Sequence, residues 1–419
     1  MPRLRDRRIR QTALRVEVLE DRTVPAGNVT ATLVGNTLRI VGDQQDNKIF
    51  VYSAENQGVV VVVEGADSTE INGFLQPVSF PAASVAGLDI RMNGGNDSVT
   101  LGKTRSNTVT GLTLSRLLQY NGGNDDDTLE VANVSVARTT TIRGGGGDDS
   151  VTINNGSHFS SSVSISLDTG SQDESVSIDN ATFDKPTAIR GSDVDSTVNI
   201  TANTGSTTFN ASLTIRTQSG DDQVTLDEAD VSSGPLTIGT GDGDDQVTLD
   251  DGTYKILSLN TGLGDDTVNI GTSTAVSVTL GAAIVLGDGT NGLTIGLTIQ
   301  NSSNFGLLSI LGGSGVDNIA LNYISVLGRT NIRTLPGDDI LNIQDSSFSP
   351  SSNVTADMGD GDDTVTLNSN TFQDGASNQD RFDGGGHSNN GDSIGGSGNS
   401  GLNVGVEITN FEIKEPTLP

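Results

Sequence analysis

Acidic side chains recur along this chain of 419 residues at a nearly constant spacing. Each begins a motif Asp-x-U-x-U, in which U is aliphatic, and consecutive copies start about 24 residues apart. Carboxylates in such a row repel one another, and they are oxygen ligands that divalent cations prefer. The row therefore indicates cation binding. Its twelve first positions are Asp97, Asp127, Asp149, Glu174, Ser196, Asp222, Asp245, Asp266, Asn291, Asp317, Asp339 and Asp363.

Aliphatic residues define the elements that must hold this row. Two and four positions after each first position stand only Val, Ile or Leu, from Val99 and Leu101 to Val365 and Leu367. A third, mostly aliphatic row lies seven positions before it, from Ile90 to Ala356. Apolar residues at period 2 on both sides of a Gly- and Asp-rich segment predict a strand, a turn and a second strand. One such unit cannot bury its own apolar face, so the repeats must stack.

The repeat predicts an all-β fold, a parallel β-helix solenoid of about 12 coils with roughly 24 residues per coil. We expect right-handed coiling, because crossovers between parallel strands have that hand. An array of β-sandwiches would need antiparallel hairpin turns every 8–12 residues or so, which fits the fixed register poorly. The segment after the second strand varies in length and often holds one aromatic residue. We expect these aromatics to form a half-buried stack: Phe159, Phe183, Phe209, Tyr254, Phe305, Phe348 and Phe372.

Stacked coils would place neighbouring carboxylates about 4.8 Å apart. Each pair then costs roughly 0.9 kcal/mol in water and about 3.5 kcal/mol at an effective dielectric constant of 20. Calcium suits this row, because it takes about 6–8 oxygens from carboxylates and backbone carbonyls. The alternative is that Asp and Asn only close turns through hydrogen bonds to the backbone, with solvent screening their charge. The predicted calcium ligands are Asp97, Asp127, Asp148, Asp149, Asp222, Asp244, Asp245, Asp265, Asp266, Asp317, Asp339, Asp362 and Asp363.

Two turns fit the nonapeptide G-G-x-G-x-D-x-U-x completely, at residues 144–152 and 312–320. The segments 241–247, 262–268 and 359–365 lack only its first glycine. These turns resemble the haemolysin-type RTX calcium-binding repeats, and the resemblance implies that stacked turns hold Ca²⁺ between Asp side chains and backbone carbonyls. RTX repeats run in tandem every nine residues or so, whereas this chain has one per coil. We expect Glu174, Ser196, Asn291 and the turn around Pro336 to interrupt the row.

The composition divides the chain into four parts. Residues 1–26 are basic and are predicted to be a sorting or disordered segment. Within this segment, residues 16–26 (VEVLEDRTVPA) resemble the LEDR/LEPR-type motif of planctomycete extracellular proteins. That resemblance implies export or surface sorting. Residues 27–89 are predicted to be a capping unit with a β-hairpin at Thr30–Val41, and residues 90–375 the solenoid. Residues 376–419 are rich in Gly, Asn and Ser and are expected to form a cap with a last strand over Val404–Ile413.

Several classes of chemistry are disfavoured by composition. The chain has no Cys, two His and a formal net charge of −30, which excludes disulfides and thiolates and argues against nucleic-acid partners. His158 and His387 are expected to be solvated loop residues, and no apolar run is long enough to span a membrane. Arg143, Arg190, Arg216 and Arg333 share one position relative to the third row, so we expect them to pair with turn acids.

These patterns predict a non-catalytic, calcium-binding β-helix protein with a structural or adhesive role, extracellular or at the cell surface. Its predicted partners are calcium ions, with cell-envelope polysaccharide or surface proteins as further candidates. The alternative is a carbohydrate-active β-helix enzyme, a polysaccharide lyase or glycosidase. Such an enzyme would need two unlike acids, or an acid and a base, outside the periodic row. The bases outside the motif are scattered along the chain: Arg105, Arg116, Arg138, Lys185, Lys255 and Arg329.

Overall fold

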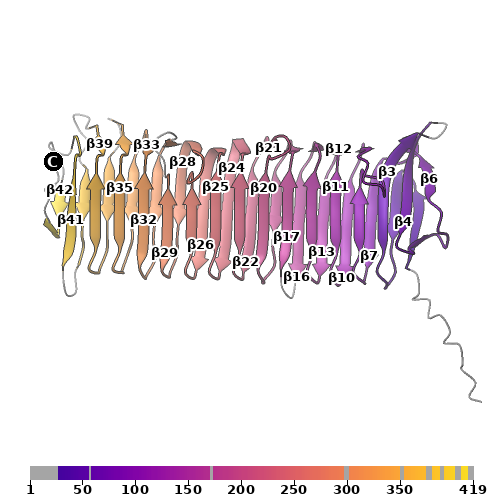
Figure 1. Cartoon of the computed structure of the whole chain (residues 1–419), viewed down its shortest axis with the longest axis horizontal. Helices are drawn as coiled ribbons and strands as arrows, with labels where there is room; N and C mark the ends of the chain where they lie inside the picture. The colour runs from indigo at the N-terminus through magenta and orange to yellow at the C-terminus, as the bar shows by residue number, and fades with distance from the viewer. Residues whose placement is uncertain are drawn as a thin grey trace, which may run out of the picture.

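A computed structural model describes residues 27–55, 58–169, 173–296, 302–349, 353–373, 380–386, 391–401 and 407–413. The basic segment 1–26, with its LEDR-like motif, and His387 lie outside these ranges. The described chain is a parallel β-solenoid of about 11 turns with roughly 24 residues per turn, which confirms the predicted fold class. Strands of consecutive turns lie side by side along one long axis, with β3, β4 and β6 near one end and β41 and β42 at the other (Figure 1).

Three ladders of parallel strands run along this axis. The first ladder carries the row that begins at Ile90. Its strands are β2 (Thr37–Val41), β7 (Gly87–Asn93), β10 (Leu118–Asn124), β13 (Thr140–Gly146), β16 (Val163–Thr169), β19 (Thr187–Arg190), β22 (Leu213–Ser219), β24 (Ala229–Asp242), β26 (Thr253–Leu263), β28 (Ser277–Val285), β31 (Leu308–Leu311), β34 (Thr330–Arg333), β37 (Val354–Asp357), β40 (Arg381–Asp383) and β42 (Glu407–Thr409).

The second ladder carries the aliphatic pairs that follow the acids. Its strands are β3 (Lys48–Glu55), β8 (Ser98–Leu101), β11 (Thr128–Ala132), β14 (Ser150–Asn154), β17 (Glu174–Asp179), β20 (Ser196–Thr201), β23 (Gln223–Asp227), β25 (Gln246–Asp250), β27 (Thr267–Ile270), β29 (Asn291–Ile295), β32 (Asp317–Asn322), β35 (Ile340–Gln344), β38 (Thr364–Asn368), β41 (Asp392–Ser397) and β43 (Phe411–Ile413). The predicted last strand is thus two short strands, β42 and β43, on different ladders.

The third ladder carries the aromatic row. Its strands are β9 (Leu112–Leu114), β12 (Val134–Val136), β15 (Ser157–Phe159), β18 (Ala181–Phe183), β21 (Thr207–Phe209), β30 (Ser303–Phe305), β33 (Ile324–Val326), β36 (Ser347–Phe348) and β39 (Thr371–Phe372). The long strands β24, β26 and β28 each continue from this ladder into the first one, so the two ladders share one sheet.

The N-terminal unit joins the solenoid directly. Strand β1 (Asn28–Val34) forms the predicted antiparallel hairpin with β2, and β2 pairs in parallel with β7 of the first full coil. Strand β3 begins the second ladder and pairs in antiparallel with β4 (Val59–Ala66), which pairs with β6 (Val78–Pro81). The unit also contains β5 (Glu70–Ile71) and a 3₁₀ helix, η1 (Ala82–Ser84). Within the described ranges no helix is long and apolar enough to cross a membrane.

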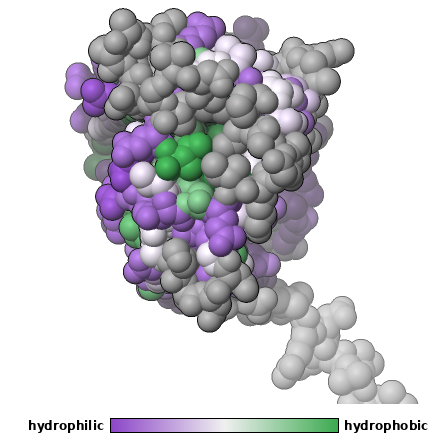
Figure 2. Space-filling view, turned by 90° about the vertical axis from the view of Figure 1, so that its left-hand side faces the viewer, coloured by the Kyte–Doolittle hydropathy of each residue, from purple (hydrophilic) through white to green (hydrophobic). Residues whose placement is uncertain are grey.

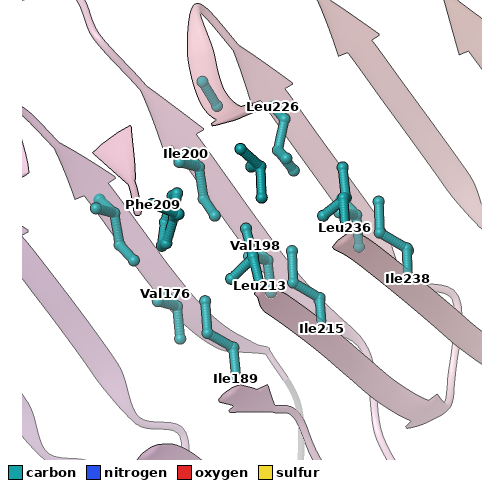
Figure 3. Close-up of a cluster of buried hydrophobic side chains, with 14 of the residues drawn as sticks. Val176, Ile189, Val198, Ile200, Phe209, Leu213, Ile215, Leu226, Leu236 and Ile238 are labelled. Carbon is teal, nitrogen blue, oxygen red and sulfur yellow. The ribbon is translucent and has the colours of Figure 1, made fainter. Parts of the chain in front are cut away.

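The interior is built from the predicted aliphatic rows. Val176 and Val198 of the second ladder face Ile189 and Ile215 of the first, and all four are buried (Figure 3). The aromatic row is buried as well, with Phe183 stacked between Phe159 and Phe209 at centroid distances of 5.1 and 4.7 Å. Seen from the end that carries β41 and β42, hydrophobic residues lie toward the middle with hydrophilic residues around them (Figure 2). Burial of these rows, about 25 cal/mol per Å² of apolar surface, is the main stabilising contribution.

Candidate metal centre

The motif acids lie inside the solenoid, at the corner where the chain turns from the first ladder into the second. We call them the inner acidic row, and each is only 0–2% exposed. Such burial is unusual for carboxylates, which are seldom fully buried without partners. The row consists of Asp97, Asp127, Asp149, Glu174, Asp222, Asp245, Asp266, Asp317, Asp339 and Asp363.

One carboxylate oxygen of each inner acid is bound to the neighbouring coil. In all but Asp317 it accepts the backbone N–H of the row residue one coil earlier, as Asp127 Oδ1 does from Asp97 at 2.9 Å and Asp245 Oδ1 from Asp222 at 2.9 Å. Asp317 Oδ1 accepts instead from the side-chain amide of Asn291, at 3.0 Å. The same bond recurs from Asn47, whose N–H reaches Asp97, to the bond between Asp363 and Asp392 near the C-terminal end. These bonds fix the stacking of the turns, because each one joins two consecutive coils.

The second carboxylate oxygen is the exceptional atom of the site. In Asp97, Asp127, Asp149, Glu174 and Asp363 it is buried and has no hydrogen-bond partner among the described residues. Burying an ionised oxygen without a partner costs several kcal/mol or so, and proteins avoid it. A proton or a metal cation removes that cost. These oxygens therefore mark where a cation is needed.

The residue five positions before each acid shapes the space around that oxygen. Gly122 and Gly144 stand there in two coils, and a Cβ on either would lie 2.2 Å from the second oxygen of Asp127 or Asp149. In four other coils the position is a buried threonine that lowers the pKa of its acid: Thr217, Thr240, Thr261 and Thr334. The Thr217 and Thr240 hydroxyls donate to carbonyls of the next coil at 3.1 and 3.0 Å. Glycine at this position thus leaves room beside the acid, whereas threonine places a hydroxyl group next to it.

Burial raises the pKa of the inner acids far above that of a solvated carboxyl group. Loss of solvation is the largest cause, and neighbouring carboxylates add to it, while the backbone N–H bond lowers the pKa in part. The pKa rises to about 8 at Asp127 and Glu174. It rises to about 7 at Asp97, Asp149, Asp222 and Asp363, and to about 6 at Asp245 and Asp317. Near pH 7 the row therefore takes up protons unless another cation occupies it.

A second set of acids, which we call the outer acidic row, precedes the inner acids by one position and points to solvent. Six of its carboxylates are exposed and accept a backbone N–H from the following coil, as Asp126 does from Asp148 at 2.9 Å and Asp244 from Asp265 at 2.8 Å. Asp148 and Asp362 are half-buried. The inner acids accept N–H groups from the preceding coil and the outer acids accept them from the following coil. The two rows therefore connect the turns in opposite directions. The outer row consists of Asp126, Asp148, Asp195, Asp221, Asp244, Asp265, Asp338 and Asp362.

The predicted calcium ligands divide between these two rows. Nine of them, beginning with Asp97, lie in the inner row, and Asp148, Asp244, Asp265 and Asp362 lie in the outer row. In the described part of the chain no three acidic or histidine side chains converge as a metal-binding group. Calcium would therefore have to complete its shell with backbone carbonyls of the turns. The prediction that solvent screens all the turn acids is wrong for the inner row, because those side chains are buried.

Three predicted interruptions in fact continue the row. The turn around Pro336 keeps the bond from the Asp317 N–H to Asp339 Oδ1, at 2.8 Å. Glu174 Oε2 accepts the backbone N–H of Asp149 at 3.3 Å, and Asn291 Oδ1 accepts that of Asp266 at 3.0 Å. Ser196 does interrupt it, since the N–H of Glu174 donates to the backbone carbonyl of Asp195 instead. The sequence analysis also missed Asp392, which accepts from Asp363 at 2.8 Å. Its signal was the pair Asp392 and Ile394, a further Asp-x-U in the Gly-rich tail.

The sequence held a signal for the inward direction of the acids. Asp97 has the same parity as Val99 and Leu101, and alternate residues of a strand face the same side. The preceding position, occupied by Asp126 or Asp148 in the next coils, has the opposite parity and faces outward. The alternation of inward and outward side chains along the strand, extended by one residue into the turn, therefore predicts that the inner acids face the interior and the outer acids face solvent.

The predicted pairing of the four arginines with turn acids is wrong, because even Arg333 pairs with a strand residue, Asp357 of β37. Arg333 Nε lies 3.7 Å from Asp357 Oδ2, but Arg143, Arg190 and Arg216 form no ion pair with any described residue. His158 also differs from the expected loop residue, because it lies in β15 with Nε2 2.8 Å from Asp184 Oδ2.

Comparison with protein-family models, with curated proteins and with solved structures gave no match to this chain.

Proposed function

We propose that this chain is a non-catalytic, calcium-binding β-solenoid with a structural or adhesive role outside the cell or at its surface. The observation that carries the proposal is the buried second oxygen of the inner acids, typified by Asp127 and Asp149, which lacks a hydrogen-bond donor. A carboxylate oxygen that accepts no hydrogen bond is a hard ligand, and hard cations such as Ca²⁺ bind ligands of this kind. The alternative of a carbohydrate-active enzyme stays a prediction of the sequence.

Calcium fits the row better than a proton does at neutral or higher pH. A proton satisfies one carboxyl group, whereas a divalent cation between two coils would neutralise two carboxylates and use backbone carbonyls of their turns. The inner acids, with the turn carbonyls, are the residues that would hold it. The exposed outer row, which includes Asp244 and Asp265, would raise the local cation concentration without burying charge.

Only the sequence supports an extracellular location for the protein. Calcium sites of extracellular modules work at about 10⁻⁴–10⁻³ M, concentrations that open, repeated sites can use. The resemblances to RTX turns and to the LEDR-type motif at residues 16–26 point the same way. A solenoid whose turns are tied by cations would be a stiff spacer or adhesive rod, and the polar outward positions of its strands would form its contact surfaces.

The proposal is tested by calcium titration of the full chain at about pH 8, with magnesium as the control ion. We expect calcium binding by calorimetry and a Tm higher by at least several degrees in about 5 mM calcium than in EGTA, since a ligand that binds only the folded state stabilises it. Magnesium should act weakly, because it requires a stricter octahedral shell. Identical melting curves in calcium and EGTA, together with no calorimetric signal, would show that the row carries only protons.

A further inference from the structure

Three arginines stand in register on the outer face of the first ladder. Arg143 of β13 pairs across the sheet with Ser166 of β16, Ser166 with Arg190 of β19, and Arg190 with Arg216 of β22. Neighbouring strands lie about 4.8 Å apart, so the row from Arg143 to Arg216 covers about 14 Å along the solenoid axis. All three arginines are exposed. They form a linear cationic row on the outside of an acidic protein.

The row lines a shallow cleft of about 420 Å³. Its floor is made of small and hydroxyl-bearing side chains, including Thr141, Ser164, Ala188 and Thr214. A second depression of about 240 Å³ shares Thr141 and Arg143 with it and extends to strands β7 and β10. The two depressions are neighbours along the first ladder.

The guanidinium groups of this cleft are not neutralised by the protein. The chain has 53 acidic and 23 basic residues, so acidic partners are abundant. Other exposed arginines form ion pairs with them: Arg91 Nε lies 3.1 Å from Asp89, and Arg333 pairs with Asp357. Arg143, Arg190 and Arg216 have no ion pair or hydrogen bond to any described residue. The single acid that lines the cleft, Asp168, accepts a hydrogen bond from the Ser166 hydroxyl at 2.6 Å. Three guanidinium groups against one carboxylate leave the cleft with a net positive charge, which favours anions.

We propose that this cleft binds an extended anionic polysaccharide, whose carboxylate or sulfate groups lie against Arg143, Arg190 and Arg216. Arg143 and Arg190 stand two strands apart and Arg190 and Arg216 one strand apart, so they match a polymer with widely spaced charges. The Thr and Ser side chains that line the cleft match its hydroxyl groups. The inference goes beyond the proposed calcium-binding role and does not depend on it, because the cleft lies on the outer face of the first ladder and uses none of the acidic-row residues.

Other polyanions fit the cleft less well. Duplex nucleic acid carries one charge per 1.7 Å or so of its axis, several times the density of the arginine row, and the net charge of −30 would repel it. Single strands bind on exposed aromatic rings, and Tyr120, the one aromatic that lines either depression, is buried. An acidic peptide would find no free strand edge here, because β13, β16, β19 and β22 are paired on both sides.

The test measures binding of polygalacturonate and of dextran sulfate to the full chain in EGTA, with neutral dextran as the control polymer. We expect binding of at least one charged polymer, none of dextran, and an affinity that falls steeply with salt. Replacing Arg143, Arg190 and Arg216 together by Ala should weaken binding about tenfold or more, since it removes three charge pairs with the polymer. The matched control replaces the exposed Arg105, Arg116 and Arg138, which removes the same charge outside the cleft and should change affinity less than about twofold.

Four results would overturn the inference. Equal loss in both triple variants would show that only net charge matters, and absence of binding to either charged polymer would remove the site. Tighter binding of single-stranded DNA or polyglutamate through the same arginines would reassign it to another class of partner. Binding that appears only with calcium and survives the cleft triple variant would show bridging by the acidic rows, which would support the proposed function and contradict this site. A triple Arg→Lys variant, which keeps the charge and the long side chains, covers the case in which the Ala variant fails to fold.

Discussion

Asn291 shows how an uncharged side chain serves in the inner acidic row. Its Oδ1 accepts the backbone N–H of Asp266 at 3.0 Å, as an aspartate would. Its Nδ2 donates to Asp317 Oδ1 and to the backbone carbonyl of Gly287, both at 3.0 Å. The uncharged amide of Asn291 thus forms the hydrogen bonds that join its coil to the coils on either side. A carboxylate is therefore not needed at the other positions to connect the coils. We propose that the second oxygen of each of these carboxylates binds a cation.

The substitution Asp127→Asn tests that role, with Asp126→Asn as the matched control in the adjacent outer row. In EGTA at about pH 8 we expect Asp127→Asn to raise the free energy of unfolding by roughly 1–3 kcal/mol, because it removes a buried charge and supplies a donor. The same change should reduce the stabilisation by calcium. Asp126 is exposed, so its substitution should change stability by less than about 0.5 kcal/mol.

Chemical denaturation in EGTA and in calcium measures both effects. The interpretation of the inner row would be wrong if Asp127→Asn destabilised the calcium-free protein, or if both variants kept the full response to calcium. The first outcome would mean that the carboxylate serves packing alone. The second would place calcium elsewhere in the molecule.

At the scale of elements, the strands were predictable because their signal is local and repeated many times. Fixed spacing between the row at Ile90 and the pair Val99 and Leu101 defined the strand, the turn and the second strand, and the structure places these residues in β7 and β8. The direction of the turn acids was missed because acidic residues are normally assigned to solvent, and tertiary stacking overrides that preference here. The unpaired state of Arg143, Arg190 and Arg216 could not be predicted, since it depends on distances between coils.

The turns between the first and second ladders depend on glycine for a steric reason. Gly264 has φ +134°, and a Cβ on it would lie 2.1 Å from the carbonyl oxygen of Gly243 in the preceding coil. A side chain there would meet both an unfavourable backbone conformation and a backbone atom that cannot move away. The close approach of consecutive turns therefore requires glycine at this position.

Gly264→Ala should consequently destabilise the protein by about 1–3 kcal/mol or more. Gly239→Ala is the matched control, because Gly239 lies in β24 with an ordinary φ and a Cβ there would meet only the Asn260 carbonyl oxygen, at 3.9 Å. The control should be neutral or slightly stabilising, since alanine restricts the unfolded chain. Thermal melting separates the two. Equal Tm values for both variants would contradict the close stacking of these turns.

At the scale of the whole molecule, the net charge of −30 is distributed over surfaces with different roles. The inner row is enclosed, and under the proposed function it would take up protons or calcium ions, so its contribution to the external field would depend on pH and on calcium. The outer row stays in solvent on the same corner of the solenoid. The three arginines of the cleft stand on the outer face of the first ladder, where an anionic polymer can approach without contacting the acidic turns.

The inner row as a whole predicts an unusual dependence of stability on pH. Without calcium, folding raises the pKa of its acids to about 6–8 at eight positions, so the folded state holds protons that the unfolded chain releases near pH 4. This contribution to stability is complete below about pH 4 and is lost as pH rises through 6–8. Asp184 and Asp383 have lowered pKa values and act in the opposite sense, losing their contribution as pH falls below about 4.

Calcium should largely remove this dependence of stability on pH, because it competes with protons for the same oxygens. In EGTA we expect Tm to fall by at least several degrees between about pH 5 and pH 8.5, and in about 5 mM calcium we expect the fall to be largely abolished. The two melting curves should coincide near pH 5, where the row is protonated in either solution. A calcium-free Tm that rises between pH 5 and 8 would mean that the buried carboxylates are ionised and satisfied without a cation.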